Sequence, residues 1–330
     1  MKTFDIPIVL FMFKRDKILQ IIDRIREIQP EKVYLLADHG RNIEEKKQVE
    51  ELRATVERAI DWKCDLIKNY AEENRGVYEN IGEGAIWVLR REKWAIFLED
   101  DNLPELSFFE FCRDMLTRYE NDTRILWVCG TNYLGNYEPR DDVSYVFTRH
   151  MLPCGWASWG NKFEKFYDGT LSMCDDPTIL ARIKDVYCNL AVYRQYRDSW
   201  MGEYRRFQRN VRPISWDYQM DFSIKANNLF GICPCKNQIK NIGVDEDSIH
   251  GGSSFTNIMT KRFCGMDSYP MEFPLKHPTA LLIDPVFEER IGKIILYPFL
   301  KRMRNALFSL LHKLLRIPEG KGLRSFWRKD

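Results

Sequence analysis

Three consecutive carboxylates, Glu99, Asp100 and Asp101, follow the apolar run "AIFL" directly and are followed in turn by "NLP". Adjacent like charges repel one another, so this arrangement is costly unless water, hydrogen bonds or a cation offsets it. Clustered carboxylate oxygens suit Mg²⁺ or Mn²⁺, which also bind phosphate oxygens. The alternative is a plain acidic turn before a helix, because carboxylates favour the positive end of a helix.

The elements that position these carboxylates can be read from the hydrophobic pattern of the first 130 residues. Apolar runs predict strands at 6–13, 32–37, 63–68, 93–98 and 124–129. Amphipathic or apolar-striped segments between them predict helices at 17–28, 43–60, 81–89 and 107–119. Alternation of strand and helix predicts an α/β fold whose mostly parallel sheet carries helices on both faces.

Ligands of such sheets bind beyond the carboxyl ends of the strands. The chain places Arg15, Asp38, residues 74–76 and the carboxylate triplet at or near those ends. We therefore expect these residues to meet at one edge of the sheet.

Two phosphate-binding signatures are missing from the sequence. The pattern G-x-x-x-x-G-K-[ST] is absent, and "FKRDK" stands where a Gly-rich turn would follow the first strand. This argues against a dinucleotide site and against a sugar-phosphate nucleotidyltransferase.

The rest of the chain divides into two parts. Residues 136–285 are rich in aromatics, cysteines and short turns and are predicted to form the acceptor half of one domain, 1–285, whose nucleotide half is 1–135. Residues 286–330 are predicted to be a basic tail. The nine cysteines, several within apolar runs, indicate reduced thiols in a cytoplasmic protein.

The tail carries most of the positive charge. Residues 291–330 hold ten Lys or Arg against two Asp or Glu, a charge of +8, which leaves about −6 for the rest of a chain of net charge +2. Apolar residues recur at helical spacing, at Leu300, Met303, Leu307, Leu310, Leu311 and Leu314. Such a helix suits an anionic membrane surface, at the inner face of the cell membrane, or packs its leucines on the body. Nucleic acid is disfavoured because few aromatics accompany the cations.

Taken in order, these motifs resemble the nucleotide-diphospho-sugar glycosyltransferases of GT-A fold, a Rossmann-like fold. The resemblance is to the inverting branch that contains the N-acetylglucosaminyltransferase I type and its bacterial relatives. It covers about residues 4–255, through "VYLLADHG", "ENRGVYENIGEGAIWVL", "AIFLEDDNLP", "CGWASWG", "SWDYQM" and "IKNIGVDEDSIHGG".

The resemblance implies a role for each matching residue. Asp101 and His250 would bind Mn²⁺ or Mg²⁺, Asp217 would be the catalytic base, and Gly155 and Trp156 would contact the acceptor or sugar. The implied nucleotide-binding residues are Phe11, Arg15, Asp38, Asn74, Arg75, Gly76, Glu99 and Asp100. Cys154 and Ile249 depart from the family pattern, which often has Trp and Thr at these positions.

Other roles remain open for several of these residues. Asp217 could cap the helix that follows it, which is a common use of Asp. His250 could be an ordinary loop residue, and Trp156 a core aromatic.

The resemblance predicts a metal-dependent inverting glycosyltransferase that moves a sugar, from UDP by preference, to a hydroxyl of a glycan or glycolipid. Two alternatives remain: a nucleotidyltransferase or other nucleotide-handling enzyme, and a non-catalytic, membrane-associated module of the same fold.

Overall fold

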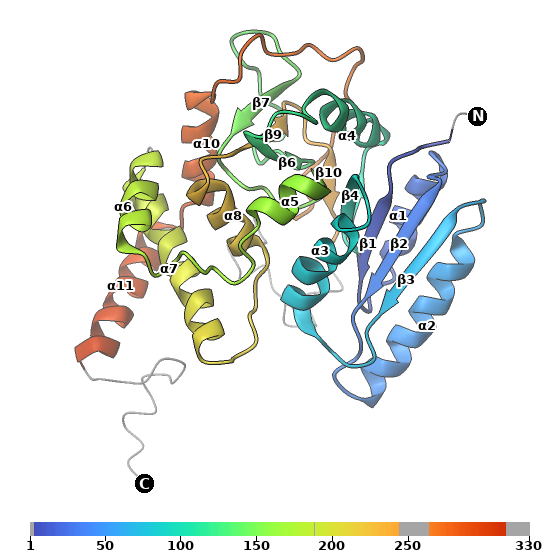
Figure 1. The fold of residues 1–330 in the computed structure, drawn as a ribbon, viewed down its shortest axis with the longest axis horizontal. Helices are drawn as coiled ribbons and strands as arrows, with labels where there is room; N and C mark the ends of the chain where they lie inside the picture. Colours follow the sequence, from blue (N-terminus) through green and yellow to red (C-terminus); the bar gives the residue numbers. More distant parts are fainter. Residues whose placement is uncertain (1–2, 188, 244–263, 315–330) are drawn as a thin grey trace.

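One eight-stranded sheet runs through the protein (Figure 1). The computed structural model describes residues 3–187, 189–243 and 264–314. The strand order is β3-β2-β1-β4-β8-β6-β9-β7. The strands of this sheet are β1 Ile8–Met12, β2 Lys32–Ala37, β3 Asp65–Tyr70, β4 Trp94–Glu99, β6 Ile125–Cys129, β7 Tyr145–Thr148, β8 Trp156–Trp159 and β9 Phe230–Pro234.

Six of these strands run in the same direction. β1, β2, β3 and β4 are parallel neighbours, and β9 is parallel to β6. β8 lies antiparallel between β4 and β6, and β7 is antiparallel to β9 at the edge. A second sheet pairs β5, Asn102–Pro104, with β10, Ile239–Asn241, in antiparallel fashion. The fold is therefore the expected α/β class, with a mixed and mostly parallel sheet of Rossmann-like type.

Helices cover both faces of the large sheet. One face packs against α1 Ile18–Arg26, α2 Ile43–Ala59 and α4 Leu106–Arg118. The other packs against α3 Gly84–Leu89, which continues the π-helix η1 Tyr78–Glu83, and against α5 Gly160–Phe166, α8 Asp217–Ala226 and α10 Pro285–Ile295. A smaller cluster joins α8 to α6 Pro177–Val186 and α7 Leu190–Gln208.

The two-sided core explains why the central strands are apolar throughout. Successive side chains of a strand point to opposite faces. In β1, Ile8 and Leu10 pack on the side of α1, whereas Val9 and Phe11 pack on the side of α3. A strand covered on both faces has no polar side to display, and its sequence is a continuous apolar run.

The predicted acceptor half, residues 136–285, contains helices that its short turns did not indicate. Four helices, α5 to α8, lie between residues 160 and 226, and α7 alone has 19 residues. Its apolar and aromatic residues are interspersed with charged ones, and only Val192, Tyr193, Trp200 and Glu203 are buried. A weak stripe of this kind gives little signal in the sequence.

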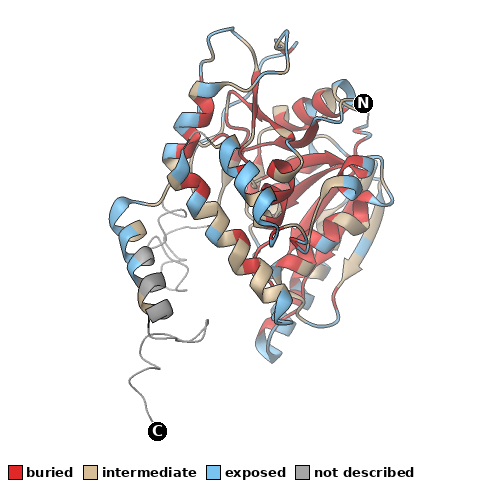
Figure 2. Ribbon diagram, turned by 60° about the vertical axis from the view of Figure 1, so that its left-hand side comes forward, coloured by how far each residue is buried: buried red, intermediate tan, exposed pale blue. Residues whose placement is uncertain are grey.

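The C-terminal segment divides into an integral and a projecting helix. Phe287, Ile291 and Ile295 of α10 are buried in the core, so the body of the protein continues past the predicted boundary at residue 285. Helix α11, Phe299–Leu314, extends away from the body (Figure 2). Within the described ranges every helix is too short or too polar to cross a bilayer. The eight cysteines in these ranges are free thiols, as expected.

Trp156 lies at the centre of an aromatic stack inside the core. Its ring stacks on Phe97 at a centroid distance of 3.9 Å and on Trp127 at 4.3 Å. Only 1% of Trp156 is exposed, so neither face of its ring is open to a sugar. This is the placement of a core aromatic, and stacking on a sugar would require the core to open.

We expect Trp156→Ala to lower the free energy of unfolding by about 3–5 kcal/mol, because the truncation leaves a large cavity between two fixed rings. Urea unfolding followed by far-UV circular dichroism measures the change. Trp94→Ala is the matched control, since Trp94 is only partly buried and should cost clearly less. A loss below about 1 kcal/mol at Trp156 would contradict the packing described here.

Candidate active site

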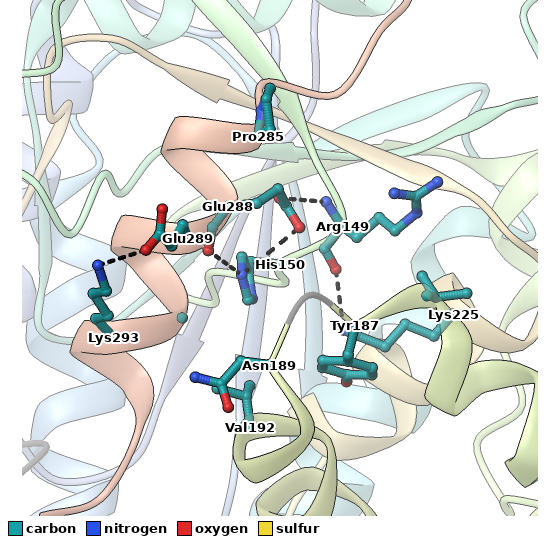
Figure 3. Close-up of a pocket in the computed structure, with 12 residues that line it drawn as sticks. Arg149, His150, Tyr187, Asn189, Val192, Lys225, Pro285, Glu288, Glu289 and Lys293 are labelled. Carbon is teal, nitrogen blue, oxygen red and sulfur yellow. Dashed lines mark hydrogen bonds and ion pairs between the residues drawn. The ribbon is translucent and has the colours of Figure 1, made fainter.

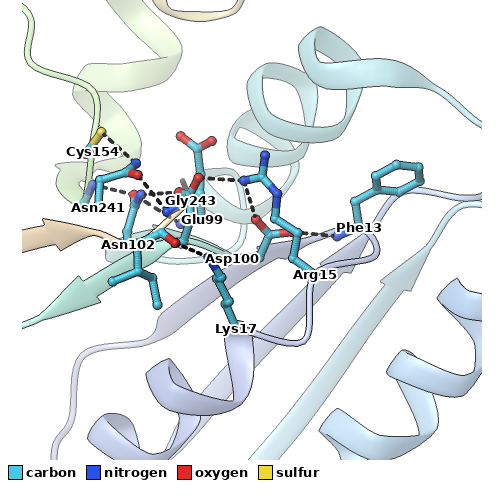
Figure 4. Close-up of polar contacts among 12 residues, drawn as sticks. Phe13, Arg15, Lys17, Glu99, Asp100, Asn102, Cys154, Asn241 and Gly243 are labelled. Atoms are coloured by element: carbon cyan, nitrogen blue, oxygen red, sulfur yellow. Dashed lines mark hydrogen bonds and ion pairs between the residues drawn. The ribbon is translucent and has the colours of Figure 1, made fainter. Parts of the chain in front are cut away.

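The carboxylate triplet and the loop after β1 are brought together by neighbouring parallel strands. β1 and β4 pair in register, with Phe11 opposite Glu99, so both chains leave the sheet at the same edge (Figure 4). The backbone N–H of Phe13 donates to Asp100 Oδ2 at 3.3 Å. The two loops are therefore joined directly.

Arg15 supplies the cation that the triplet requires. Its Nη1 lies 2.6 Å from Asp101 Oδ2 and 3.4 Å from Asp100 Oδ1. The side chain of Arg15 is 45% exposed, whereas those of Asp100 and Asp101 are 12% and 15% exposed. Part of the repulsion between the carboxylates is thus offset by a side chain that can reach solvent.

The triplet is electrostatically strained despite this ion pair. Burial raises the pKa of Asp100 to about 6, although Arg15 lowers it. Burial, followed by repulsion from Asp101 and Asp100, raises the pKa of Glu99 well above its usual range. Perturbed carboxyl groups of this kind gather at sites that bind cations or perform proton transfer.

Asn102, which sequence reasoning missed, fixes the geometry of Asp101. It is 1% exposed, and its Nδ2 donates to Asp101 Oδ1 at 2.7 Å. Its Oδ1 accepts the N–H of Gly155 at 2.9 Å. The N–H of Ile242 donates to the Asp101 carbonyl at 2.8 Å, next to the β5–β10 pair. The small sheet therefore holds the end of the triplet in place.

A Gly is required at position 155 by this close packing. Its φ is +61°, and a Cβ there would lie 2.5 Å from Ile239 Cδ1. Gly155 thus permits Ile239 of β10 to pack close to the start of β8. It does not face an open crevice.

The donor atoms of the triplet fit a hard divalent cation. In the described ranges no three His, Cys, Asp or Glu side chains already converge as a metal site. Mg²⁺ and Mn²⁺ do not need such a cage, because one or two carboxylates, substrate phosphates and water complete their coordination. Asp101, with Asp100 beside it, offers this partial set once Arg15 moves aside. His250 lies outside the described residues.

Asp38 acts as an acceptor for the loop at 74–76. Its Oδ1 accepts the N–H groups of His39 and Arg75, both at 2.8 Å. Its Oδ2 accepts the N–H of Gly76 at 2.9 Å and Nδ2 of Asn74 at 3.0 Å. Because a carboxylate has about four acceptor positions, Asp38 is saturated by these bonds. It positions the loop, and this arrangement leaves it no acceptor for a nucleobase.

We expect Asp38→Asn to lower the free energy of unfolding by about 2–4 kcal/mol. The amide presents its own N–H groups to buried donors, and hydrogen bonds to a charged acceptor are worth about 1.5–3 kcal/mol each. Urea unfolding measures the loss. Asp65→Asn, at an exposed position, is the control and should change stability little. Equal stability of the two variants would show that Asp38 does not hold the loop.

Two arginines flank the same loop in different ways. Arg75 is committed to the fold, since Nε and Nη2 donate to Asn80 Oδ1 at 3.0 and 2.8 Å. Arg212, which sequence reasoning missed, is half exposed, lies 3.9 Å from Glu79 and packs its Cδ against Gly76. Its guanidinium is a more available cation at this edge than that of Arg75.

Asp217 stands at the first position of α8 and belongs to the same electrostatic site. The hydroxyl of Ser215 donates to its Oδ1, and Ser215 also accepts the N–H of Tyr218 at 3.1 Å, the bond of a helix cap. Burial raises the pKa of Asp217, whereas hydrogen bonds from Ser215 and from the backbone N–H groups of Asp217 and Tyr218 lower it. Its charge in turn raises the pKa of Glu99. Asp217 therefore also helps to hold the start of α8, a role that it shares with Ser215.

Two predicted residues lie apart from this cluster. Phe11 is 2% exposed and stacks on Phe97 at 5.8 Å in the core beneath the site. Trp156 lies in the same core, as described above. Neither side chain is open to a ligand, because both belong to strands that are covered on each face.

A separate cavity of about 370 Å³ lies near the amino ends of the parallel strands (Figure 3). It lies next to residues that follow β7 and precede β9, far along these strands from the triplet. Lys225 Nζ pairs with Asp221 within α8 and donates to the carbonyl of Arg149 at 3.0 Å, and Glu288 Oε1 accepts the backbone N–H of Arg149 at 3.0 Å. These contacts tie α8 and α10 to the sheet.

The chain matches no family model and no curated protein. Solved structures overlap with it in part. The match to HddC from Yersinia pseudotuberculosis complexed with GMP-PN covers 47% of this chain and 77% of HddC, with 10% sequence identity and a TM-score of 0.30. The match to UDP-glucose pyrophosphorylase complexed with UDP-glucose covers 76% of this chain and 98% of that enzyme, with 8% sequence identity and a TM-score of 0.36. Its apo form has the same coverage, 10% identity and a TM-score of 0.38.

Fold and site together define the class to which the protein belongs. It is a Rossmann-like α/β protein with an acidic site at the carboxyl edge of its sheet. There Arg15 pairs with Asp101, and the charge of Asp217 acts on Glu99. TM-scores below 0.5 support no particular activity, so the site residues alone decide which function is proposed.

Proposed function

We propose that the protein is an inverting glycosyltransferase that moves a sugar from a nucleotide diphosphate, UDP by preference, to a hydroxyl of a glycan or glycolipid. The main support is the joint presence of two acidic groups of different kind at one edge. Asp101 of the triplet is paired with the guanidinium of Arg15, and Asp217 stands apart from that pair in a buried position. An inverting transfer needs one anion-binding centre and one base.

Asp217 is proposed as the base. As the acceptor oxygen attacks the anomeric carbon, Asp217 takes the hydroxyl proton. The bond from that carbon to the diphosphate oxygen breaks, and the diphosphate leaves with the electron pair. A carboxylate whose pKa is raised by burial is a stronger base than a solvated one, which favours this transfer.

Asp101 and Asp100 are proposed to hold the divalent cation. Such an ion, when bound, neutralises the charge that develops on the departing diphosphate. Arg15 is proposed to leave Asp101 when the donor binds and to pair with a phosphate oxygen instead. Its 45% exposed side chain has room for this movement.

We expect Arg15→Gln to bind Mn²⁺ in the absence of nucleotide, because the variant removes the cation that competes for Asp101. Calorimetry or the Mn²⁺ electron paramagnetic resonance signal measures this binding. Wild type should bind Mn²⁺ with nucleotide but at least about tenfold more weakly without it, a difference of about 1.4 kcal/mol. Arg90→Gln, at an exposed ion pair with Glu164, is the control. Equal nucleotide-free affinity in wild type and Arg15→Gln would exclude competition.

The test of the proposed function is the identity of the product. Purified protein is incubated with Mn²⁺ and a panel of UDP-, GDP- and CMP-sugars, with glycan and glycolipid acceptors, and release of nucleotide is measured. Release of a nucleoside diphosphate with an inverted anomeric product supports the proposal. A parallel incubation supplies nucleoside triphosphates with sugar 1-phosphates, and pyrophosphate formed there would instead identify a nucleotidyltransferase.

A further inference from the structure

Helix α11 is fixed to the body at its base and is open along one side. Gln195 of α7 joins it to the body: its Nε2 donates to the carbonyl of Ile295 at 3.1 Å, and its Oε1 accepts the N–H of Tyr297 at 2.8 Å. The helix begins two residues later and has 16 residues, a length of about 24 Å. Figure 2 shows that it extends from the globular part as a separate rod.

The open side carries large apolar side chains. Phe299 is 63% exposed, Leu300 80%, Met303 54% and Leu307 56%. At about 100° per residue these four positions fall within one stripe about 100° wide. An amphipathic helix normally buries such a stripe against its own protein. Here the described part of the stripe faces away from the body.

Cations accompany the stripe. Arg304 lies beside it and is exposed. Lys301 lies on the other side of the helix, with its Nζ 3.7 Å from the centre of the Tyr297 ring at the helix base. The segment 291–330 has a charge of +8, whereas the rest of the chain is acidic. Apolar residues on one side and Lys or Arg around them favour the boundary between headgroups and acyl chains of an anionic bilayer.

We propose that α11 binds the surface of an anionic lipid bilayer through this stripe. The two forces differ in kind. Insertion of Phe299, Leu300, Met303 and Leu307 into the headgroup boundary removes exposed apolar surface from water. Attraction of Arg304 to anionic headgroups, with Lys301 acting at longer range, adds a component that salt screens. The inference deepens the proposed function, on which it rests for the location of the acceptor, since an enzyme held at this surface meets lipid-linked glycans.

Membrane binding is tested on the full chain without donor or metal. Vesicles of phosphatidylcholine, with and without phosphatidylglycerol in equal parts, are sedimented with the protein, and the bound fraction is measured at low and high salt. Wild type is expected to bind the anionic vesicles, with an affinity that falls as salt rises, and to bind neutral vesicles at least about tenfold more weakly.

Two double variants separate the two forces. Leu300→Ser with Leu307→Ser removes apolar contact, and Lys301→Glu with Arg304→Glu reverses charge; each should weaken binding at least about tenfold. Leu282→Ser and Lys47→Glu are the matched controls, because Leu282 is 74% exposed and the Lys47 side chain 79% exposed away from α11. Both controls should bind as wild type does.

Three results would overturn the inference. The first is absence of binding to anionic vesicles, and the second is vesicle binding that neither double variant weakens. The third is a dimer, detected by sedimentation velocity, that only the leucine variant dissociates. The last result would identify a second copy as the partner of the stripe. Asp217→Asn and Asp101→Ala should bind vesicles normally, so a failure here is distinct from a failure of the proposed reaction.

Discussion

Asp217→Asn is expected to lower kcat by about 10²–10⁴-fold, the usual contribution of a positioned general base. The amide has nearly the shape of the carboxylate but cannot take the proton from the hydroxyl of the acceptor sugar. Donor binding should persist, because Asp217 does not contact Arg15 or Asp101 in any described hydrogen bond or ion pair. The measurement is steady-state release of nucleotide, with the KM for the donor determined beside kcat.

A graded control distinguishes a base from a structural residue. Ser215→Ala removes one hydrogen bond to Asp217 but keeps its carboxylate, so kcat should fall by about tenfold or less. Thermal unfolding of both variants checks that the start of α8 stays folded. Activity of Asp217→Asn within about tenfold of wild type would assign the residue to the helix end alone and leave the base to be found elsewhere.

The central strands could be predicted from sequence because burial on both faces leaves a continuous apolar run. β1, β2, β4 and β6 fall within or close to the predicted runs. The edge at which Arg15 meets Asp101 follows from the parallel order of the strands, and the structure brings those two side chains to 2.6 Å.

Other features depend on contacts that lie far apart in the chain. β8 has four residues and enters the sheet antiparallel between β4 and β6, opposite residues about 60 positions earlier. No local period marks such an insertion. The saturation of Asp38 depends on how the loop at 74–76 folds back, and the role of Asn102 depends on its contact with Gly155. Short polar residues in loops have too many possible partners for sequence to decide.

Asp101→Ala is expected to abolish metal-dependent nucleotide binding. Outer-shell partners of a metal typically contribute 10–100-fold in affinity, so loss of the proposed direct ligand should weaken Mn²⁺-dependent binding of UDP by at least about a hundredfold. Calorimetry of UDP, GDP and CMP, each with Mn²⁺ and with chelator, measures this. Glu110→Ala, at an exposed carboxylate of α4, is the control and should bind as wild type does.

Arg15 makes the outcome informative in both directions. In Asp101→Ala its guanidinium loses the partner at 2.6 Å and keeps only Asp100 at 3.4 Å, so it becomes free to pair with phosphate. We therefore expect this variant to keep a weak affinity for nucleotide that no longer depends on Mn²⁺. Full Mn²⁺-dependent affinity in Asp101→Ala would instead show that the cation is held elsewhere, and the triplet would be an acidic turn neutralised by Arg15.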